Sequence, residues 1–301
     1  MRIQIRHQMS VTPPAGTSNM VLQVLATPKS GPTQKVADWS IEMEGFAEAG
    51  PFTDAYGNMA QLVNVLRPEG DYLITISGVV DTNDRQGVLG KLTGEPVPAL
   101  FKRQTALTKV PVSLYGKFRN AKDSRIDVLH ALMARVGETL ATVKPAPAAP
   151  TQSQSQSQSS EGGSQSHSQS SGTDQSEAQM LANGEAIEAA VAPAEDVLPL
   201  PPASDYAHAF IGAARSLDIP ARFVTGYLLG DEDTPASFHA WAEAYDEGLG
   251  WIGFDPMLQL CPTDRHVRMV IGLDALTAQP IRVVPVGDGV VEVDVSVTQA
   301  E

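Results

Sequence analysis

Cysteine is nearly missing from this chain of 301 residues, which has only Cys261. A single cysteine excludes an internal disulfide and any zinc site built from several thiolates. Basic residues are also scarce, because 21 Lys and Arg stand against 35 Asp and Glu and give a formal net charge of -14. Nucleic acid is therefore not an expected partner, since neutralising its phosphates requires clustered basic side chains.

Long apolar runs are missing as well. No stretch approaches the roughly 18 apolar residues that a membrane helix needs, so no membrane association is expected. Residues 1–7 alternate apolar and polar side chains and lack the continuous apolar segment of a signal peptide. Together with the scarcity of cysteine, these absences predict a cytoplasmic protein.

The first hundred or so residues contain short apolar or alternating runs separated by Pro, Gly, Asn and Asp. Alternation with period two between turn-forming residues is typical of β-strands joined by hairpins. The pattern predicts an antiparallel β domain over residues 1–115. Its predicted strands are residues 2–9, 20–26, 37–43, 59–66 and 72–80.

Residues 123–143 place apolar side chains at helical spacing, and Ser124 with Asp127 resembles a capping box. Beyond this predicted helix the composition changes to Pro and Ala and then to Ser, Gln and Gly. The tract at about 145–177 cannot bury enough apolar surface to offset its ordering entropy, so we predict a disordered insert that acts as a passive linker. A short helix is expected at about 178–190, before the prolines that follow.

Two predicted strands, residues 238–245 and 249–255, surround the turn at 246–248. Folding the chain about this turn places His239 within about one residue of the position opposite Asp255, at a separation of ~5 Å. A histidine base and a carboxylate that orients it need this relation. The pair is therefore a candidate catalytic site.

Four stretches, taken in order, resemble the bacterial transglutaminase-like family: residues 203–211, 219–227, 237–243 and 253–256. In that family a cysteine opens the first stretch, and a histidine and an aspartate in the last two complete a triad. By this resemblance His239 is the base, Asp255 orients it, and Ala203 occupies the nucleophile position. The helix that follows, residues 204–217, has Ser204 as its expected cap, and its His208 matches a family histidine for which we expect a packing role.

The resemblance implies an α+β protein: an amino-terminal antiparallel β domain (1–115) followed by a papain-like transglutaminase-like core (116–301) that contains the insert. The family chemistry is acyl transfer through a cysteine thiol, without a cofactor or metal ion. The acidic run 231–233 does not change this expectation, because three consecutive carboxylates lack the spacing of a calcium loop. Since alanine is no nucleophile, the leading interpretation is a catalytically inactive protein, a pseudoenzyme, that binds a peptide, a protein or an active paralogue.

Two other interpretations stay open. An active acyl transferase or amidohydrolase would take its nucleophile from Ser204, Cys261 or a partner chain, although Ser204 points ~100° away from position 203 on a helix. Cys261 follows the hairpin instead of opening a helix, which favours a structural role. The family resemblance also suggests a scaffold beside an ATP-grasp-like protein. Pro201 and Pro202 change the approach to position 203, which favours natural loss of the nucleophile over an engineered replacement.

Overall fold

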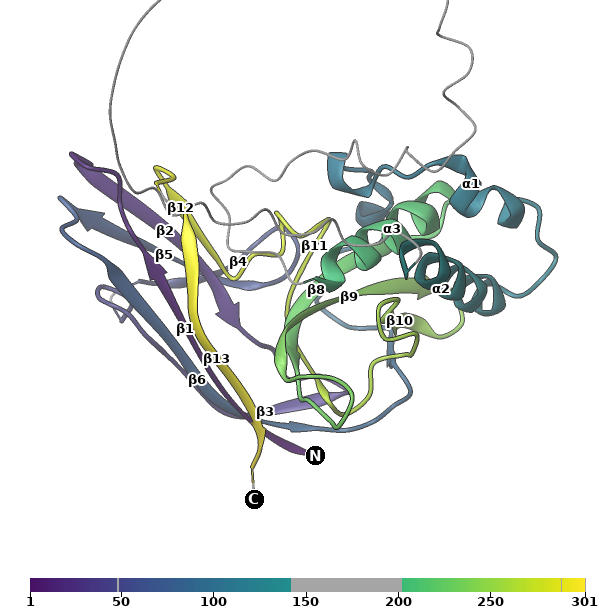
Figure 1. The fold of residues 1–301 in the computed structure, drawn as a ribbon, viewed down its shortest axis with the longest axis horizontal. Helices are drawn as coiled ribbons and strands as arrows, with labels where there is room; N and C mark the ends of the chain where they lie inside the picture. The colour runs from purple at the N-terminus through teal and green to yellow at the C-terminus, as the bar shows by residue number, and fades with distance from the viewer. Residues whose placement is uncertain (48, 142–201, 288, 301) are drawn as a thin grey trace, which may run out of the picture.

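The computed structural model describes residues 1–47, 49–141, 202–287 and 289–300 (Figure 1). Within these residues the chain is α+β, as expected, with three antiparallel sheets and two principal helices. No helix in the described ranges is long and apolar enough to cross a membrane. The predicted disordered tract at 145–177 and the predicted helix at 178–190 lie outside the described residues.

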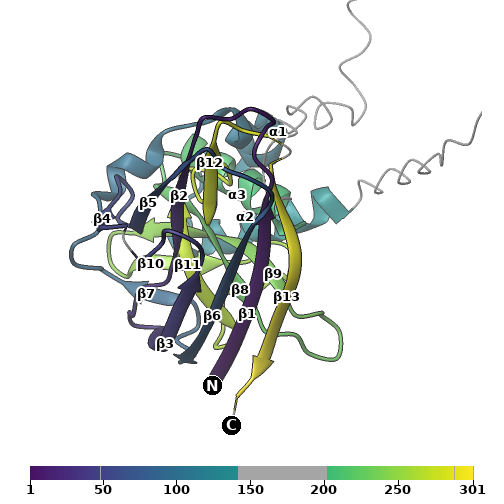
Figure 2. The same cartoon turned by 90° about the vertical axis from the view of Figure 1, so that its left-hand side faces the viewer.

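Two four-stranded sheets form the N-terminal β region, and their long strands run side by side in Figure 2. In β1, Arg2–Val11, every second side chain is buried, as a period-two pattern predicts for a strand with one covered face. The first sheet has the order β13-β1-β6-β3, with β3 Gln34–Glu42, β6 Tyr72–Thr82 and β13 Val290–Gln299. The second has the order β12-β2-β5-β4, with β2 Asn19–Thr27, β4 Pro51–Thr53, β5 Met59–Leu66 and β12 Ile281–Val284.

The C-terminal residues return to these N-terminal sheets. β13 pairs with β1, from Ile3 opposite Gln299 to Val11 opposite Val290, so the two ends of the chain lie together (Figure 2). The two C-terminal strands β12 and β13 belong to different sheets, each next to an N-terminal strand. The strand pairing therefore does not follow the predicted boundary at residue 115, which stays a prediction.

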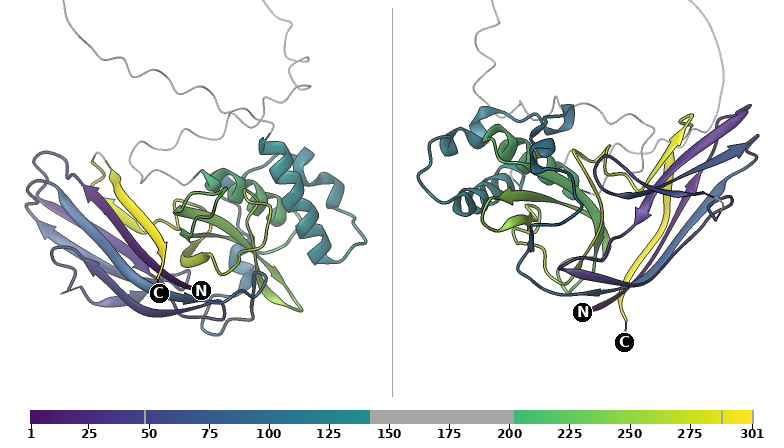
Figure 3. Two further views of the ribbon diagram at one scale, coloured as in Figure 1. Left: turned by 60° about the horizontal axis from the view of Figure 1, so that its bottom comes forward. Right: turned by 180° about the vertical axis from the view of Figure 1, so that it is seen from behind.

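The third sheet has five strands in the order β11-β8-β9-β10-β7, and the helices pack on the side away from the N-terminal sheets (Figure 3). Its strands are β7 Val88–Gly90, β8 Ala221–Leu228, β9 Ser237–Asp246, β10 Gly250–Phe254 and β11 His266–Gly272. The helices α2, Arg125–Ala141, and α3, Ala203–Ser216, both contact β9. Four short helical turns precede α2: η1 Pro98–Lys102, η2 Ala106–Thr108, α1 Val112–Tyr115 and η3 Gly116–Phe118.

The two principal helices begin differently from each other. At the start of α2 the Asp127 N–H donates to Ser124 Oγ at 3.2 Å, and this hydroxyl donates to Asp127 Oδ2 at 2.7 Å, which confirms the predicted cap. The predicted cap of α3 is wrong. Pro202 holds the N-cap position, and Ser204 is the second residue of the helix, where its buried Oγ meets no hydrogen-bond partner in the part of the chain that the structure describes.

Two side-chain amides from the N-terminal region bind the open edge of β11. Gln34 accepts the Arg268 N–H and donates to the Arg268 carbonyl, both at 2.8 Å. Asn58 does the same with Ile271, at 2.9 Å and 2.8 Å. Each carboxamide replaces one residue of a missing neighbouring strand, so the N-terminal region holds β11 in the sheet.

We expect Asn58→Ala to lower the free energy of unfolding by about 2–3 kcal/mol, because it leaves the buried N–H and carbonyl of Ile271 without partners. Urea unfolding followed by circular dichroism measures this loss. Asn64→Ala is the control, since Asn64 is exposed on β5, and it should change stability by no more than about 0.5 kcal/mol. Equal effects of the two variants would show that the Asn58 carboxamide does not hold the edge.

Candidate functional site

His239 on β9 and Asp255 at the end of β10 lie in direct contact. The distance between His239 Nε2 and Asp255 Oδ2 is 2.6 Å, and both side chains are buried. Phe254 pairs with Ala242, so continuing the register places Asp255 opposite Trp241, two residues from His239 instead of the expected one. The hairpin brings the two side chains together as the sequence predicts, and their catalytic role stays a prediction.

The Asp255 carboxylate accepts hydrogen bonds on both oxygens. The backbone N–H groups of Met257 and Leu258 donate to Oδ1, each at 3.1 Å. His239 reaches Oδ2, and His266 Nε2 lies 3.4 Å from the same oxygen. Burial alone would raise the pKa of Asp255, but the hydrogen bonds from His239 and His266 outweigh it and hold this pKa well below its usual range.

His266 is the site residue that the sequence did not single out. It opens β11, which pairs with β8 and places His266 opposite Leu228, outside the hairpin that carries the other two residues. Only the β8–β11 pairing, which crosses a bulge between Arg268 and Val270, brings its ring to Asp255. The available signal was its position eleven residues after Asp255 at the start of an apolar strand.

Trp241 packs against both imidazoles, whose own ring centres lie 6.0 Å apart. Its ring is stacked at 6.2 Å from His239 and lies edge-on at 5.4 Å from His266. Gly226 makes room for this indole, because a Cβ there would lie 2.9 Å from the Trp241 ring and 2.0 Å from the Val267 carbonyl oxygen. The rings are therefore held in place by contact with each other as well as by Asp255.

Position 203 is buried and carries no nucleophile. Ala203 is the first residue of α3, its exposed fraction is 1%, and α3 packs against β9, the strand of His239. The N-cap residue Pro202 offers no side-chain hydrogen bond to the first turn. A thiol at this place would meet the positive end of a helix, which stabilises a thiolate, but a methyl group gains nothing from it.

Neither substitute nucleophile is joined to the histidines. The Ser204 Oγ is buried and has no hydrogen-bond partner among the described residues, so none of their bases activates it. Cys261 is partly buried, and burial raises the pKa of its thiol, which disfavours the reactive thiolate. Among the described residues, no hydrogen bond links Cys261 to His239 or His266.

Four charged side chains form a largely buried network around Glu243, which lies on the same face of β9 as His239. Glu243 accepts from Arg222 Nε at 2.6 Å and from Arg268 Nε at 2.6 Å, and Glu95 pairs with both arginines. The Arg222 guanidinium also lies 3.8 Å from the centre of the Trp251 ring. The network ties β8, β9 and β11 together, and β9 and β11 carry the two imidazoles.

His239, Asp255 and His266 form the one group in the described ranges whose ligand atoms, all within 4.8 Å of one another, could hold a metal ion. A metal on His266 Nε2 would move the ring proton to Nδ1. The Thr263 N–H already donates to that Nδ1 at 3.1 Å, so two N–H groups would then face each other. The residues therefore fit a hydrogen-bonded group better than a cation site.

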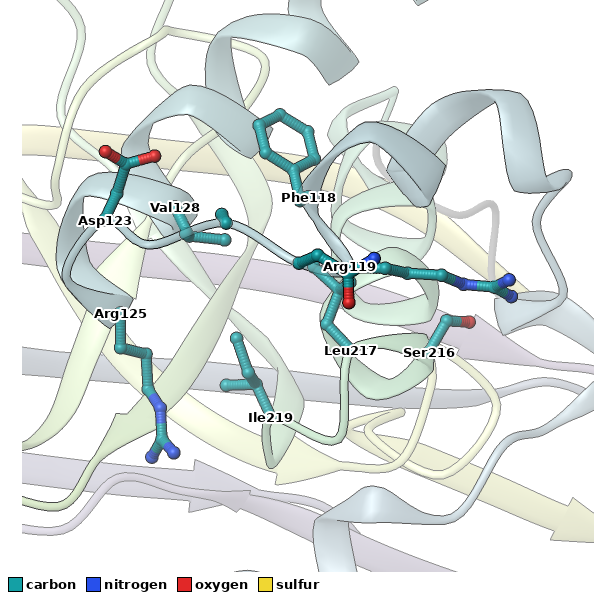
Figure 4. Close-up of a pocket in the computed structure, with 10 residues that line it drawn as sticks. Phe118, Arg119, Asp123, Arg125, Val128, Ser216, Leu217 and Ile219 are labelled. Carbon is teal, nitrogen blue, oxygen red and sulfur yellow. The ribbon is translucent and has the colours of Figure 1, made fainter.

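A groove of about 630 Å³ opens at the other end of α3, between Ser216, Leu217 and the start of α2 (Figure 4). The 14 residues of α3 separate it from Ala203 by ~20 Å. The guanidinium groups of Arg119 and Arg125 point apart at its rim, and each has a partner elsewhere, Tyr115 and Glu247. The groove is not part of the His239 site.

Two family models match this chain. Residues 3–81 match the bacterial transglutaminase-like N-terminal region, and residues 193–256 match the transglutaminase-like superfamily. These ranges contain the N-terminal strands and the segment from before α3 to the residue after Asp255. The chain thus carries both regions that its sequence resembles.

Similar proteins agree with this assignment of the fold. The uncharacterized protein ML0607 of Mycobacterium leprae is 30% identical over 99 residues, which cover 31% of this chain and 35% of that protein. A solved structure from Cytophaga hutchinsonii, described as a cysteine protease, has a TM-score of 0.58 and 18% identity and covers 98% of this chain and 88% of its own. This likeness places the chain in a transglutaminase-like, cysteine-protease-like fold and says nothing further about activity.

Proposed function

We propose that this chain, which joins a bacterial transglutaminase-like N-terminal region to a transglutaminase-like core, is a catalytically inactive protein that binds a peptide or a protein in the cytoplasm. The observation that carries the proposal is Ala203 at the start of α3, the helix that packs on the strand of His239, together with a His239–Asp255 contact of 2.6 Å. Acyl transfer by this fold needs a nucleophile next to its base. An active paralogue of the chain is one such protein partner.

The binding half of the proposal rests on the free acceptor of His239. Its Nε2 is used by Asp255, and no hydrogen bond among the described residues occupies Nδ1. A neutral imidazole whose Nε2 carries the proton presents a lone pair at Nδ1. The N–H of a peptide or of a side-chain amide is a donor of the kind this atom can accept.

The test of inactivity compares the natural chain with Ala203→Cys in three assays: amine incorporation into glutamine peptides, glutamine deamidation and peptide hydrolysis. We expect no turnover by the natural chain and no adduct with an electrophilic acyl probe. Ala203→Cys is expected to form that adduct at position 203, and Ala203→Ser with the same probe is the control. Turnover by the natural chain, or a mapped adduct on Ser204 or Cys261, would establish an active enzyme instead.

Binding is tested separately with an extended-peptide library and the purified full chain. Peptides that bind should lose about tenfold in affinity in His239→Phe, which removes one hydrogen-bond acceptor. Asn64→Ala, at an exposed position on β5, should leave affinity unchanged. Equal affinity of the natural chain and His239→Phe would show that the peptide binds elsewhere on the chain. That result would favour the alternative of a scaffold beside an ATP-grasp-like protein.

A further inference from the structure

Only one tautomer of the neutral His266 ring allows hydrogen bonds to both of its partners, the Thr263 N–H and the Asp255 carboxylate. The Thr263 N–H donates to His266 Nδ1 at 3.1 Å, so Nδ1 must present a lone pair. The proton of the neutral ring then lies on Nε2, which faces Asp255 Oδ2 at 3.4 Å. Burial lowers the pKa of His266 although Asp255 opposes the shift, which favours this neutral ring.

Asp255 is held on three sides without any help from His239. Met257 and Leu258 fix Oδ1 through their backbone N–H groups, and His266 donates to Oδ2. An ionised carboxylate only accepts hydrogen bonds, so the group at its remaining position must be a donor. His239 Nε2 occupies that position at 2.6 Å, so its ring must carry the proton on Nε2.

We propose that His266 is a positioning residue that, through Asp255, fixes the Nε2–H tautomer of His239 and keeps its Nδ1 lone pair free. The Thr263 N–H donates to His266, and His266 and His239 both donate to the Asp255 carboxylate, so His266 acts on His239 by holding that carboxylate in place. The proposed binding role gives the free Nδ1 its use, but the positioning does not depend on that role.

The tautomers are measured on the full chain with ¹⁵N-labelled histidine, by long-range nitrogen–proton NMR spectra at neutral pH. We expect both His239 and His266 to carry their proton on Nε2, with a downfield proton signal from the short His239–Asp255 bond. In His266→Phe we expect a mixture of His239 tautomers and at least roughly tenfold faster exchange of that proton with water. His266→Gln, which keeps an N–H near the former Nε2, should restore the natural pattern.

His208→Gln is the matched control. His208 is as buried as His266, and its Nε2 accepts the Ala275 N–H at 3.0 Å without touching Asp255. The His208→Gln variant should leave the His239 NMR signals unchanged. A general loosening of the core would instead shift these signals in every variant.

Three results would overturn the proposal. One is an unchanged His239 tautomer and exchange rate in His266→Phe. Another is a proton on Nδ1 of His266 in the natural chain, a measurement that does not depend on whether His266→Phe folds. The third is stoichiometric Zn²⁺ binding that shifts both ring signals, which would make the group a metal site. Turnover by the natural chain would refute the proposed inactivity and leave this inference standing.

Discussion

Glu243→Ala should destabilise the fold by about 3–5 kcal/mol, because among the described residues it leaves Glu95 as the one carboxylate for the fully buried Arg222 and the largely buried Arg268. The Arg222 side chain is fully buried, and burial lowers its pKa although Glu243 opposes the shift. Burial would raise the pKa of Glu243, but the charges and hydrogen bonds of both arginines lower it instead. Urea unfolding at pH 7 measures this loss: the midpoint urea concentration should fall, while the slope of the unfolding free energy against urea concentration should stay the same.

An exposed ion pair is the control for the Glu243 prediction. Lys102 and Asp218 lie 2.8 Å apart, but the Asp218 side chain is 84% exposed, so solvent screens the pair. Asp218→Asn, which suits the positive φ of 63° at this position, should therefore reduce stability by less than about 1 kcal/mol. If Glu243→Ala were equally mild, the arginines would be stabilised by something other than this carboxylate.

Much of the local structure follows from the sequence, because periodicity and end signals act over a few residues. β5 has the predicted ends, Met59 and Leu66, and α2 lies within the predicted helix with its Ser124 cap. The His239–Asp255 contact was also accessible, because a three-residue turn fixes which residues of a hairpin can meet. The family ranges agree with the resemblance that these segments carry.

Contacts between distant segments could not be predicted in the same way. No local pattern shows that β11 pairs with β8, and this pairing brings His266 to Asp255. The hydrogen bonds from the Gln34 and Asn58 carboxamides to the β11 backbone also depend on the tertiary fold. From the sequence alone, polar residues of this kind indicate only a turn or an exposed position. Ser204 failed as a cap for a different reason: the N-cap lies two residues earlier than the sequence pattern indicates, at Pro202, and the helix begins at Ala203.

These distant contacts link the N-terminal region to the candidate site. Gln34 binds the backbone of Arg268, whose guanidinium donates to Glu243 on β9. Arg268 is two residues from His266 on the same strand. The N-terminal sheets thus help to fix β11, and β11 supplies the imidazole that positions Asp255. A core without these sheets would lose both edge carboxamides and present β11 as an open edge.

Acid should destabilise the protein through His208 by about 3 kcal/mol between pH 7 and pH 4. Burial lowers the pKa of His208 from 6.5 to about 4; Asp274 opposes the shift and Arg215 adds to it. Between these two pKa values the imidazole is protonated in the unfolded chain and neutral in the folded chain. The contribution of His208 to stability is therefore fully present above pH 6.5 and is lost as the pH falls towards 4. A protonated ring would also lose its role as acceptor of the Ala275 N–H.

His208→Gln tests this pH dependence, because glutamine keeps an acceptor for Ala275 and does not titrate. Between pH 7 and pH 4 the natural chain should lose about 3 kcal/mol more stability than the variant in urea unfolding. Burial also lowers the pKa of His7 to about 4, but His7 is present in both proteins, so the difference isolates His208. His130→Gln, at an exposed position on α2, should follow the natural chain. Parallel pH curves for His208→Gln and the natural chain would contradict the burial of a neutral imidazole at position 208.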